Sequence, residues 1–307
     1  MYEGPVIDAF LHSAWIGSFG GPIPRADVVP WTDDPRLRRV MRTFHHAGDR
    51  EGAAQIPLDS VLGAMDEAGV VGGVLVAKVY YPSTAERLGV LHRELAQLSL
   101  RAEGRLPWVA TILPPEHGAG SYWDLMANPR LIEALKDAPG LVGVHITPSP
   151  WGLAPNDRWY YPLYARCVDL GLTLFSYVGM PGPLWPMEPN NPAHLEDIAL
   201  AFPDLKIIAH HLGDPWTDRM IRLAARHQNV WICTSAWHPK AYPKELIDFL
   251  GSRWHGTPGC ERVIFASDYP LMNMGKCVAS ARKLELSPEQ LSRLLHDNAK
   301  ELLFDVR

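Results

Sequence analysis

The stretch from Pro192 to Thr234, PAHLEDIALAFPDLKIIAHHLGDPWTDRMIRLAARHQNVWICT, contains the alternation that decides the fold. An amphipathic segment, 192–202, is followed by the apolar run 205–210. A second amphipathic segment, 216–227, leads to the apolar run 229–234. Apolar runs without strict polar alternation are typical of strands buried on both faces of a parallel sheet. Helix and strand therefore alternate here, as they do in a parallel α/β fold.

The same alternation extends over the rest of the chain. The amphipathic segments 58–68 and 160–170 are followed by Gly69 and Gly171, the residue type that commonly ends a helix. A last helix is predicted to begin at Ser287, where Ser-Pro-Glu-Gln has the form of a capping box. A further helix is predicted over 242–250. The runs that we interpret as strands are 5–10, 73–77, 107–112, 141–146, 172–177, 205–210, 229–234 and 262–266.

Eight such strands alternating with helices predict an α/β fold, a single (β/α)8 TIM barrel over residues 1–307. An open six-stranded sheet is the alternative, but it would need a glycine-rich phosphate loop after the first strand. The sequence there is Asp8-Ala9-Phe10-Leu11-His12, which has no glycine. Residues 13–55 form a long insertion with Pro and Trp after the first strand, and we expect it to act as a lid over the active-site face.

The composition is that of a globular protein with one large core. The chain has 307 residues, 47% of them hydrophobic, and a formal net charge of −5. This charge gives no footprint for nucleic acid or an anionic membrane, and no apolar run is long enough to span a membrane. The N-terminus does not look like a signal peptide, and the four cysteines form no CxxC pair. These features favour a cytoplasmic protein with reduced thiols.

Polar residues at the strand ends are the candidates for chemistry, because the active site of a barrel lies at the carboxyl ends of its strands. We expect His12, His211 and Asp268 to line one pocket. A strand-end histidine is also compatible with a hydrogen-bonded core position, and Asp8 is compatible with a turn cap. His210 and His211 point to opposite faces if the backbone stays extended. The other candidates are His145, Tyr177, Thr234, Ser235, Trp237 and His238.

Several motifs, taken in order, resemble one known family. The chain is similar to the amidohydrolase-related proteins that include aminocarboxymuconate-semialdehyde decarboxylase and resorcylate-type decarboxylases. The resemblance is strongest from Trp159 to the C-terminus, and the N-terminal half matches chiefly at Val6-Ile7-Asp8. The motifs are Tyr160-Tyr161-Pro162-Leu163-Tyr164, Phe202-Pro203-Asp204-Leu205-Lys206-Ile207, Ala209-His210-His211-Leu212-Gly213, Asn229-Val230-Trp231-Ile232-Cys233-Thr234-Ser235-Ala236, Val263-Ile264-Phe265-Ala266-Ser267-Asp268-Tyr269-Pro270 and Asn298-Ala299.

The chain departs from this family at the metal site that the resemblance implies. The family pattern has two histidines separated by one residue after the first strand, where this chain has Phe10 and His12. It has a histidine at the end of the fifth strand, where this chain has Tyr177. The strand-six histidine and strand-eight aspartate match His211 and Asp268.

A catalytic zinc site needs about three protein ligands and an open position. We therefore expect no metal cofactor. If a divalent metal such as zinc does bind, His12, His211 and Asp268 are the expected ligands. His145 is another candidate for the third ligand, and Tyr177 could ligate only as a phenolate, which is uncommon for zinc.

The residues favour metal-independent hydrolysis of an ester- or lactone-like bond, with Asp268 as the base and His211 beside it. His12 and Tyr177 are expected to donate hydrogen bonds to a developing oxyanion. The resemblance allows this activity, because it extends to metal-free lactonases that use the strand-eight aspartate as base. The expected substrate is a small, flat carboxylic molecule. The residues expected to bind it are Phe10, His145, Trp15, Trp237 and Ser235.

Two other functions remain open from the sequence. The first is nonoxidative decarboxylation of an aromatic or unsaturated carboxylic acid, which the family resemblance favours. No strand-end Arg or Lys obviously replaces the metal's positive charge, and the candidates for that role are Arg25 in the expected lid and Lys78 after the second strand. The second is a catalytically inactive barrel that binds a ligand. The resemblance also implies a homodimer.

Overall fold

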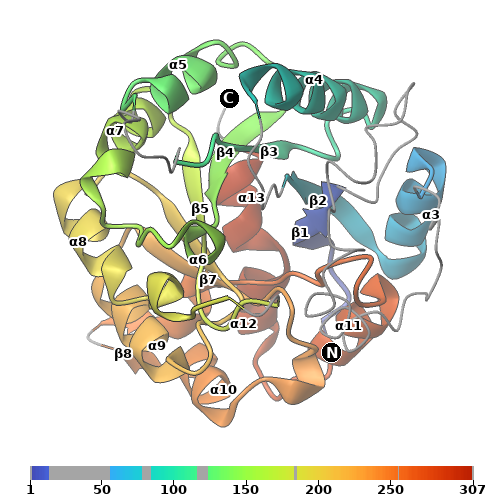
Figure 1. Cartoon of the computed structure of the whole chain (residues 1–307). Helices are drawn as coiled ribbons and strands as arrows, with labels where there is room; N and C mark the ends of the chain where they lie inside the picture. The colour runs from blue at the N-terminus through green and yellow to red at the C-terminus, as the bar shows by residue number, and fades with distance from the viewer. Residues whose placement is uncertain are drawn as a thin grey trace.

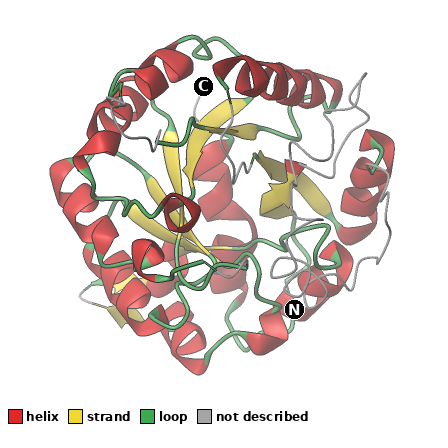
Figure 2. Cartoon of the chain, in the orientation of Figure 1, coloured by secondary structure: helices red, strands yellow, loops and turns green. Residues whose placement is uncertain are grey.

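The computed structural model describes residues 2–13, 56–77, 84–115, 124–182, 185–254 and 256–305. One eight-stranded parallel sheet has the order β1-β2-β3-β4-β5-β6-β7-β10, so each strand pairs with the next one along the chain. Figures 1 and 2 show the strands inside a ring of helices. The strands are β1 (Val6–His12), β2 (Val70–Val76), β3 (Trp108–Thr111), β4 (Leu141–Ile146), β5 (Thr173–Tyr177), β6 (Ile207–His210), β7 (Val230–Cys233) and β10 (Val263–Ile264).

The two ends of this sheet come together and complete the barrel. The backbone N–H of Ala9 in β1 donates to the carbonyl of Phe265 just after β10, at 3.0 Å. The N–H of His12 donates to the carbonyl of Tyr269 at 2.9 Å. The predicted (β/α)8 barrel is therefore confirmed, and the open six-stranded sheet is wrong. Within the described residues no helix is long and apolar enough to cross a membrane.

Helices cover the outside of the strands, with short 3₁₀ turns, one π-helical turn and one small hairpin between them. The helices are α3 (Leu58–Ala68), α4 (Ala85–Arg101), α5 (Ala127–Glu133), α6 (Pro148–Trp151), α7 (Tyr161–Asp169), α8 (His194–Ala201), α9 (Thr217–Arg226), α10 (Lys244–Leu250), α11 (Met274–Ala281), α12 (Pro288–Ser292) and α13 (Asn298–Leu303). The 3₁₀ turns are η2 (Arg158–Tyr160), η3 (Glu188–Asn190), η4 (Pro239–Ala241) and η5 (Gly259–Arg262), and the π-helical turn is η6 (Arg293–Asp297). The hairpin pairs β8 (Arg253–Trp254) with β9 (Thr257–Pro258).

Local sequence signals place several of these boundaries correctly. Helix α3 has the predicted bounds, and Gly69 ends it in the left-handed conformation at φ 70°. Ser287 and Gln290 form the predicted capping box at the start of α12. Strand β2 begins at Val70, three residues before its predicted start, because the apolar pattern continues through Gly72. The lid predicted over 13–55 falls, apart from Ser13, outside the described residues.

The barrel interior is apolar and is closed at its N-terminal end by α13. Side chains of Ile7, Val74, Val109 and Phe175 pack there with Ala299, Leu302 and Leu303 from this helix. Figure 1 shows α13 at the centre of the ring. A second, larger apolar layer lies between the strands and the outer helices. The N-terminal end of the interior is therefore filled by apolar side chains. Polar side chains occupy the carboxyl end.

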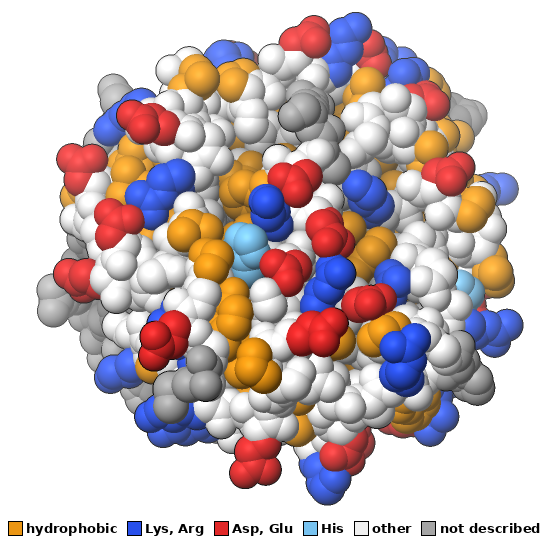
Figure 3. All heavy atoms as spheres, turned by 180° about the vertical axis from the view of Figure 1, so that it is seen from behind, with side chains coloured by type: hydrophobic (Ala, Val, Ile, Leu, Met, Phe, Trp, Pro, Cys, Tyr) orange, Lys and Arg blue, Asp and Glu red, His pale blue; other side chains and the backbone are white. Residues whose placement is uncertain are grey.

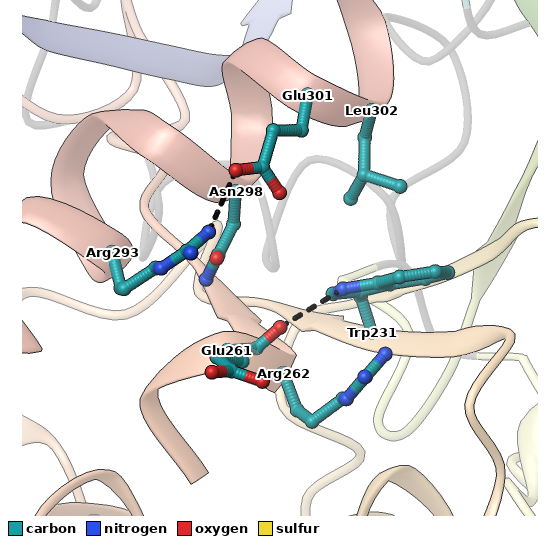
Figure 4. Close-up of a pocket in the computed structure, with 7 residues that line it drawn as sticks. All are labelled: Trp231, Glu261, Arg262, Arg293, Asn298, Glu301 and Leu302. Atoms are coloured by element: carbon teal, nitrogen blue, oxygen red, sulfur yellow. Dashed lines mark hydrogen bonds and ion pairs between the residues drawn. The ribbon is translucent and has the colours of Figure 1, made fainter. Parts of the chain in front are cut away.

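At the N-terminal end, polar groups are paired with one another. Asn298 Nδ2 donates to the carbonyls of Cys260, at 2.6 Å, and Val263, at 2.8 Å, which explains the Asn298-Ala299 motif as an anchor. A cavity of about 180 Å³ lies beside it, lined by Trp231, Glu261, Arg262, Arg293, Asn298, Glu301 and Leu302 (Figure 4). Arg293 bridges to Glu301 at 2.8 Å. Figure 3, the view from behind, shows acidic and basic side chains mixed near the centre of the face.

Candidate active site

The carboxyl ends of the strands carry the buried polar residues. His145 lies near the end of β4, Tyr177 ends β5, and His210 ends β6. Tyr177 is in register with His210, and His210 with Cys233 at the end of β7. Because the strands are parallel, these ends meet on one side of the barrel. This is the side where the sequence predicts the active site.

His12 and Asp268 form a buried pair. His12 Nε2 lies 3.2 Å from Asp268 Oδ1, and both side chains are almost fully buried. An imidazole at this distance from a carboxylate forms an ion pair with it when the imidazole is protonated. The structure thus brings together two of the three residues expected to share a pocket.

A second buried carboxylate, Asp8, holds the turn that carries Asp268. Asp8 accepts hydrogen bonds from the backbone N–H of Ser267, at 2.9 Å, and from the Ser267 hydroxyl. It also accepts from the N–H of Phe10 at 3.3 Å, but both residues lie inside β1, so Asp8 does not cap a turn after the first strand. Burial raises the pKa of Asp8 to about 7, against the opposing effect of these hydrogen bonds. Asp8 therefore positions Asp268.

The backbone bends sharply where the site residues stand. His211, Leu212, Ala236 and Asp268 all have left-handed backbone conformations, with φ of 77°, 58°, 65° and 62°. Residues other than glycine adopt this conformation at an energetic cost, and such residues cluster at functional sites. The strand ends after β6, β7 and β10 share this feature.

The bend at His211 changes the predicted direction of the two adjacent histidines. Sequence reasoning placed His210 and His211 on opposite faces if the chain stayed extended, and the chain does not stay extended. Their ring centroids are 4.5 Å apart, so both rings lie on the same side. His210 Nε2 is 2.9 Å from His145 Nε2. His210 was therefore missed as a site residue, although Gly213 and Pro215 just beyond it mark a turn.

His211 pairs with Ser235 across the strand ends. Ser235 Oγ lies 3.0 Å from His211 Nδ1, and both residues are buried. The Ser235 hydroxyl contacts His211. That Ser235 also binds substrate directly stays a prediction. Trp237, also expected to bind substrate, is half-buried against the outer apolar layer. Trp15 lies outside the described residues.

Two aromatic rings stand among the histidines. Phe10 is fully buried, and its ring centroid is 5.2 Å from His12, 4.9 Å from His210 and 5.6 Å from His211. The Tyr177 ring centroid is 4.4 Å from that of His211.

The hydroxyl of Tyr177 bonds to the following loop. It donates to the carbonyl of Met180 at 3.3 Å and accepts from the N–H of Gly182 at 3.2 Å. Tyr177 therefore ties the loop to the site, and its predicted role as an oxyanion donor remains a prediction.

The donor set of the described residues does not fit the metal site that the sequence resemblance implies. Phe10 has no donor atom, and Tyr177 engages the loop with its hydroxyl. Burial raises the pKa of that hydroxyl, so it stays a phenol rather than a phenolate. In the part of the chain that the structure describes, no three His, Cys, Asp or Glu side chains are grouped to hold a metal ion.

The protein is a TIM barrel. Buried imidazoles and a carboxylate at the carboxyl ends of its strands mark a candidate active site at the mouth of the barrel. The chain belongs to the Amidohydrolase family, whose model matches residues 7–304. A comparison with curated proteins found no match. The family resemblance inferred from the motifs is thus confirmed over nearly the whole chain.

Solved structures share the fold at low sequence identity. An uncharacterised TIM-barrel protein from Bordetella bronchiseptica is 21% identical, with a TM-score of 0.73 over 97% of this chain and 98% of that one. A 5-carboxyvanillate decarboxylase from Novosphingobium aromaticivorans is 17% identical, with a TM-score of 0.69 over 98% and 96%. Its structure contains manganese and 4-hydroxy-3-methoxy-5-nitrobenzoic acid.

A hydrolase has the same fold. The probable 2-pyrone-4,6-dicarboxylic acid hydrolase from Acinetobacter baumannii, solved with citric acid bound, is 14% identical. Its TM-score is 0.59 over 97% of this chain and 99% of that one. These likenesses establish the fold and not the reaction. The barrel is therefore shared by decarboxylases and at least one protein described as a hydrolase.

Proposed function

We propose that this protein hydrolyses an ester- or lactone-like bond in a small, flat carboxylic substrate, with Asp268 as the base. The observation that carries the proposal is the buried His12–Asp268 pair at 3.2 Å, at the strand ends. The ring centroid of Phe10 lies 5.2 Å from that of His12 and 5.6 Å from that of His211. A carboxylate beside an imidazole supplies the groups that water activation requires.

The proposed reaction has two steps. The Asp268 carboxylate takes a proton from a water molecule while the water oxygen bonds to the substrate carbonyl carbon. The carbonyl oxygen becomes an oxyanion, which hydrogen-bond donors at the strand ends stabilise. The carbon–oxygen bond to the leaving group then breaks, and the leaving oxygen takes the proton from Asp268. The products are an acid and an alcohol, or one hydroxy acid if the substrate is a lactone.

The proposed hydrolysis needs no divalent metal. A metal would lower the pKa of bound water, and in its absence a side chain must remove the proton. Asp268 supports this role because the imidazole of His12 lies 3.2 Å from its carboxylate. The aromatic ring of Phe10, which lies against three of the histidines, supports a flat substrate.

Nonoxidative decarboxylation is the second candidate, and the shared fold with 5-carboxyvanillate decarboxylase favours it. In that reaction an acid must protonate the carbon that loses CO2, and an imidazole of the same mouth would serve. The two candidates give different products from related substrates. An inactive binding barrel would give no product from either.

A substrate panel tests the proposal. Aryl esters, pyrone-type and other unsaturated lactones, and hydroxybenzoates are incubated with the protein, and acid formation and CO2 release are measured separately. Hydrolysis without CO2 release, lost in Asp268→Asn, is the expected result. CO2 release that depends on Asp268 would replace the proposal with the decarboxylase, and turnover that survives Asp268→Asn would overturn the assignment of the base.

A further inference from the structure

We infer that Ser235 and Cys233 fix the tautomer of His211, so that His211 carries its proton on Nε2 and donates it in a hydrogen bond to the substrate carbonyl oxygen. Ser235 is then a positioning residue rather than a substrate ligand. The assignment of the tautomer stands on the geometry alone, and only its use against a carbonyl rests on the proposed hydrolysis.

Three side chains form a chain of contacts behind the mouth. Ser235 Oγ lies 3.0 Å from His211 Nδ1. Cys233 Sγ lies 3.7 Å from the same Ser235 Oγ. Cys233 and Ser235 are fully buried, and His211 is nearly so. Within the part of the chain that the structure describes, the Ser235 hydroxyl has two side-chain hydrogen-bond partners, His211 and Cys233.

The strengths of the donors and acceptors decide which group donates in each of these two hydrogen bonds. A hydroxyl has one proton to donate, an imidazole nitrogen is a good acceptor, and a thiol sulfur is a weak one. If Ser235 donates to His211 Nδ1, the thiol of Cys233 can donate to Ser235 Oγ. If His211 Nδ1 donated instead, the serine proton would be left with the sulfur. The first arrangement makes the stronger hydrogen bond.

The state of Cys233 agrees with that direction. Burial raises the pKa of the Cys233 thiol to about 12, so the sulfur keeps its proton and is a donor. A thiolate would instead accept the hydroxyl proton of Ser235, and the direction of both hydrogen bonds would be reversed. With Nδ1 accepting, neutral His211 must carry its proton on Nε2.

The backbone at both ends of the contact is shaped for it. His211 has φ 77°, and Ala236, next to Ser235, has φ 65°. The N–H of His211 donates to the carbonyl of Cys233 at 3.2 Å, which ties the end of β6 to the end of β7. Left-handed backbone conformations, which cost energy in residues other than glycine, therefore occur where the side chains of His211 and Ser235 meet.

The consequence is a division of roles within the site. His12 Nε2 lies 3.2 Å from the Asp268 carboxylate, and His211 presents an Nε2–H donor. Asp268 therefore remains the base, and His211 stabilises the negative charge that develops on the carbonyl oxygen. An imidazole with its proton on Nδ1 would present a lone pair there and repel that charge.

Nuclear magnetic resonance of the 15N-labelled histidines tests the tautomer directly. Long-range 15N–1H correlations distinguish Nε2–H from Nδ1–H rings, and the His211 signals are those lost in His211→Gln. The unaltered protein should show an Nε2–H ring at His211. In Ser235→Ala the ring should lose this single form, and Ser235→Thr, which keeps the hydroxyl, should restore it.

The same variants give a kinetic readout. In Ser235→Ala, kcat should fall by about 10- to 100-fold with little change in KM, because a donor to the transition state is misplaced. Ser176→Ala is the matched control, since Ser176 is also buried, and its hydroxyl has no hydrogen-bond partner among the described residues. Its kcat and the His211 signals should be unchanged.

An Nδ1–H ring at His211 in the unaltered protein would overturn the inference, whatever the activity. The same holds for an unchanged His211 ring and kcat in Ser235→Ala. An Nε2–H ring in a protein without hydrolase activity would leave the tautomer in place and remove the proposed function instead.

Discussion

The two ends of the barrel hold polar side chains in opposite ways. At the N-terminal end, Arg293 and Glu301 pair with each other while partly exposed, and Asn298 satisfies two backbone carbonyls. At the carboxyl end, His12, His211 and Asp268 are buried, and two of the three have left-handed backbones. The first arrangement stabilises the closed barrel. The second holds ionisable groups out of water at a backbone cost, which is what a reactive site requires.

Asp268→Asn should show the difference between the two ends of the barrel most clearly, because it should affect activity and not stability. The amide keeps the shape of the side chain and its contact with His12, but it cannot remove a proton. The rate should fall by about two to four orders of magnitude, the usual scale for losing a general base. The free energy of unfolding should change little. Steady-state kinetics and urea unfolding of the same preparation check both parts.

His92 tests whether burial alone makes an imidazole functional. It packs on Trp108, away from the barrel mouth, with ring centroids 5.6 Å apart. Burial lowers its pKa from 6.5 to about 4, so the unfolded chain binds a proton at a higher pH than the folded one. This contribution to stability is present above pH 6.5 and is lost as the pH falls towards 4, by about 3 kcal/mol.

The variant His92→Leu removes that titration. Relative to the unaltered protein, its unfolding free energy should rise progressively as the pH falls through this window, and its kcat should be unchanged. A parallel pH dependence in both proteins would show that His92 does not titrate as described. Chemical unfolding at several pH values between 4 and 7 provides the comparison.

Asn298→Ala should have the reverse profile of Asp268→Asn. It removes two buried hydrogen bonds, to the carbonyls of Cys260 and Val263, and leaves both acceptors without this donor. The expected loss is about 2–4 kcal/mol of stability with kcat retained at a temperature where the variant is folded. Asn156→Ala, which removes only an exposed bond to Asp197, is the control and should change little.

The smallest effect is expected at the Arg293–Glu301 pair. Its side chains are 32% and 61% exposed, so water and salt screen the 2.8 Å contact. Arg293→Gln should change the unfolding free energy by no more than about 1 kcal/mol, and salt should reduce the difference. A larger effect would mean that the cavity of Figure 4 depends on this pair more than its exposure indicates.

The sequence predicts the fold well because the periodicity of the apolar residues reports directly on burial. Strand β4 and helix α3 have the predicted bounds. The end of the barrel on which His12, Tyr177 and Asp268 lie also follows from their position at strand ends. The sequence does not predict the contacts among them, because these depend on bends at single residues. The left-handed backbone of His211 brings His210 into the site, and no periodicity encodes it.

The role of Asp8 shows the same limit. The sequence suggests that Asp8 caps the turn after the first strand, but the structure places it inside β1, where it accepts from the N–H of Phe10. Its contact with Ser267, 259 positions away in the chain, appears only once the barrel closes. Long-range closure of this kind is set by the packing of all eight strands and not by the local sequence around Asp8.

In the proposed function, Asp268 and not a bound metal activates water at this mouth. The most direct test measures metal content and turnover of one preparation before and after chelation, with manganese and zinc added back. We predict much less than one metal ion per chain and a rate that neither chelation nor added metal changes. A near-stoichiometric metal whose removal abolishes turnover, and whose return restores it, would contradict the claim.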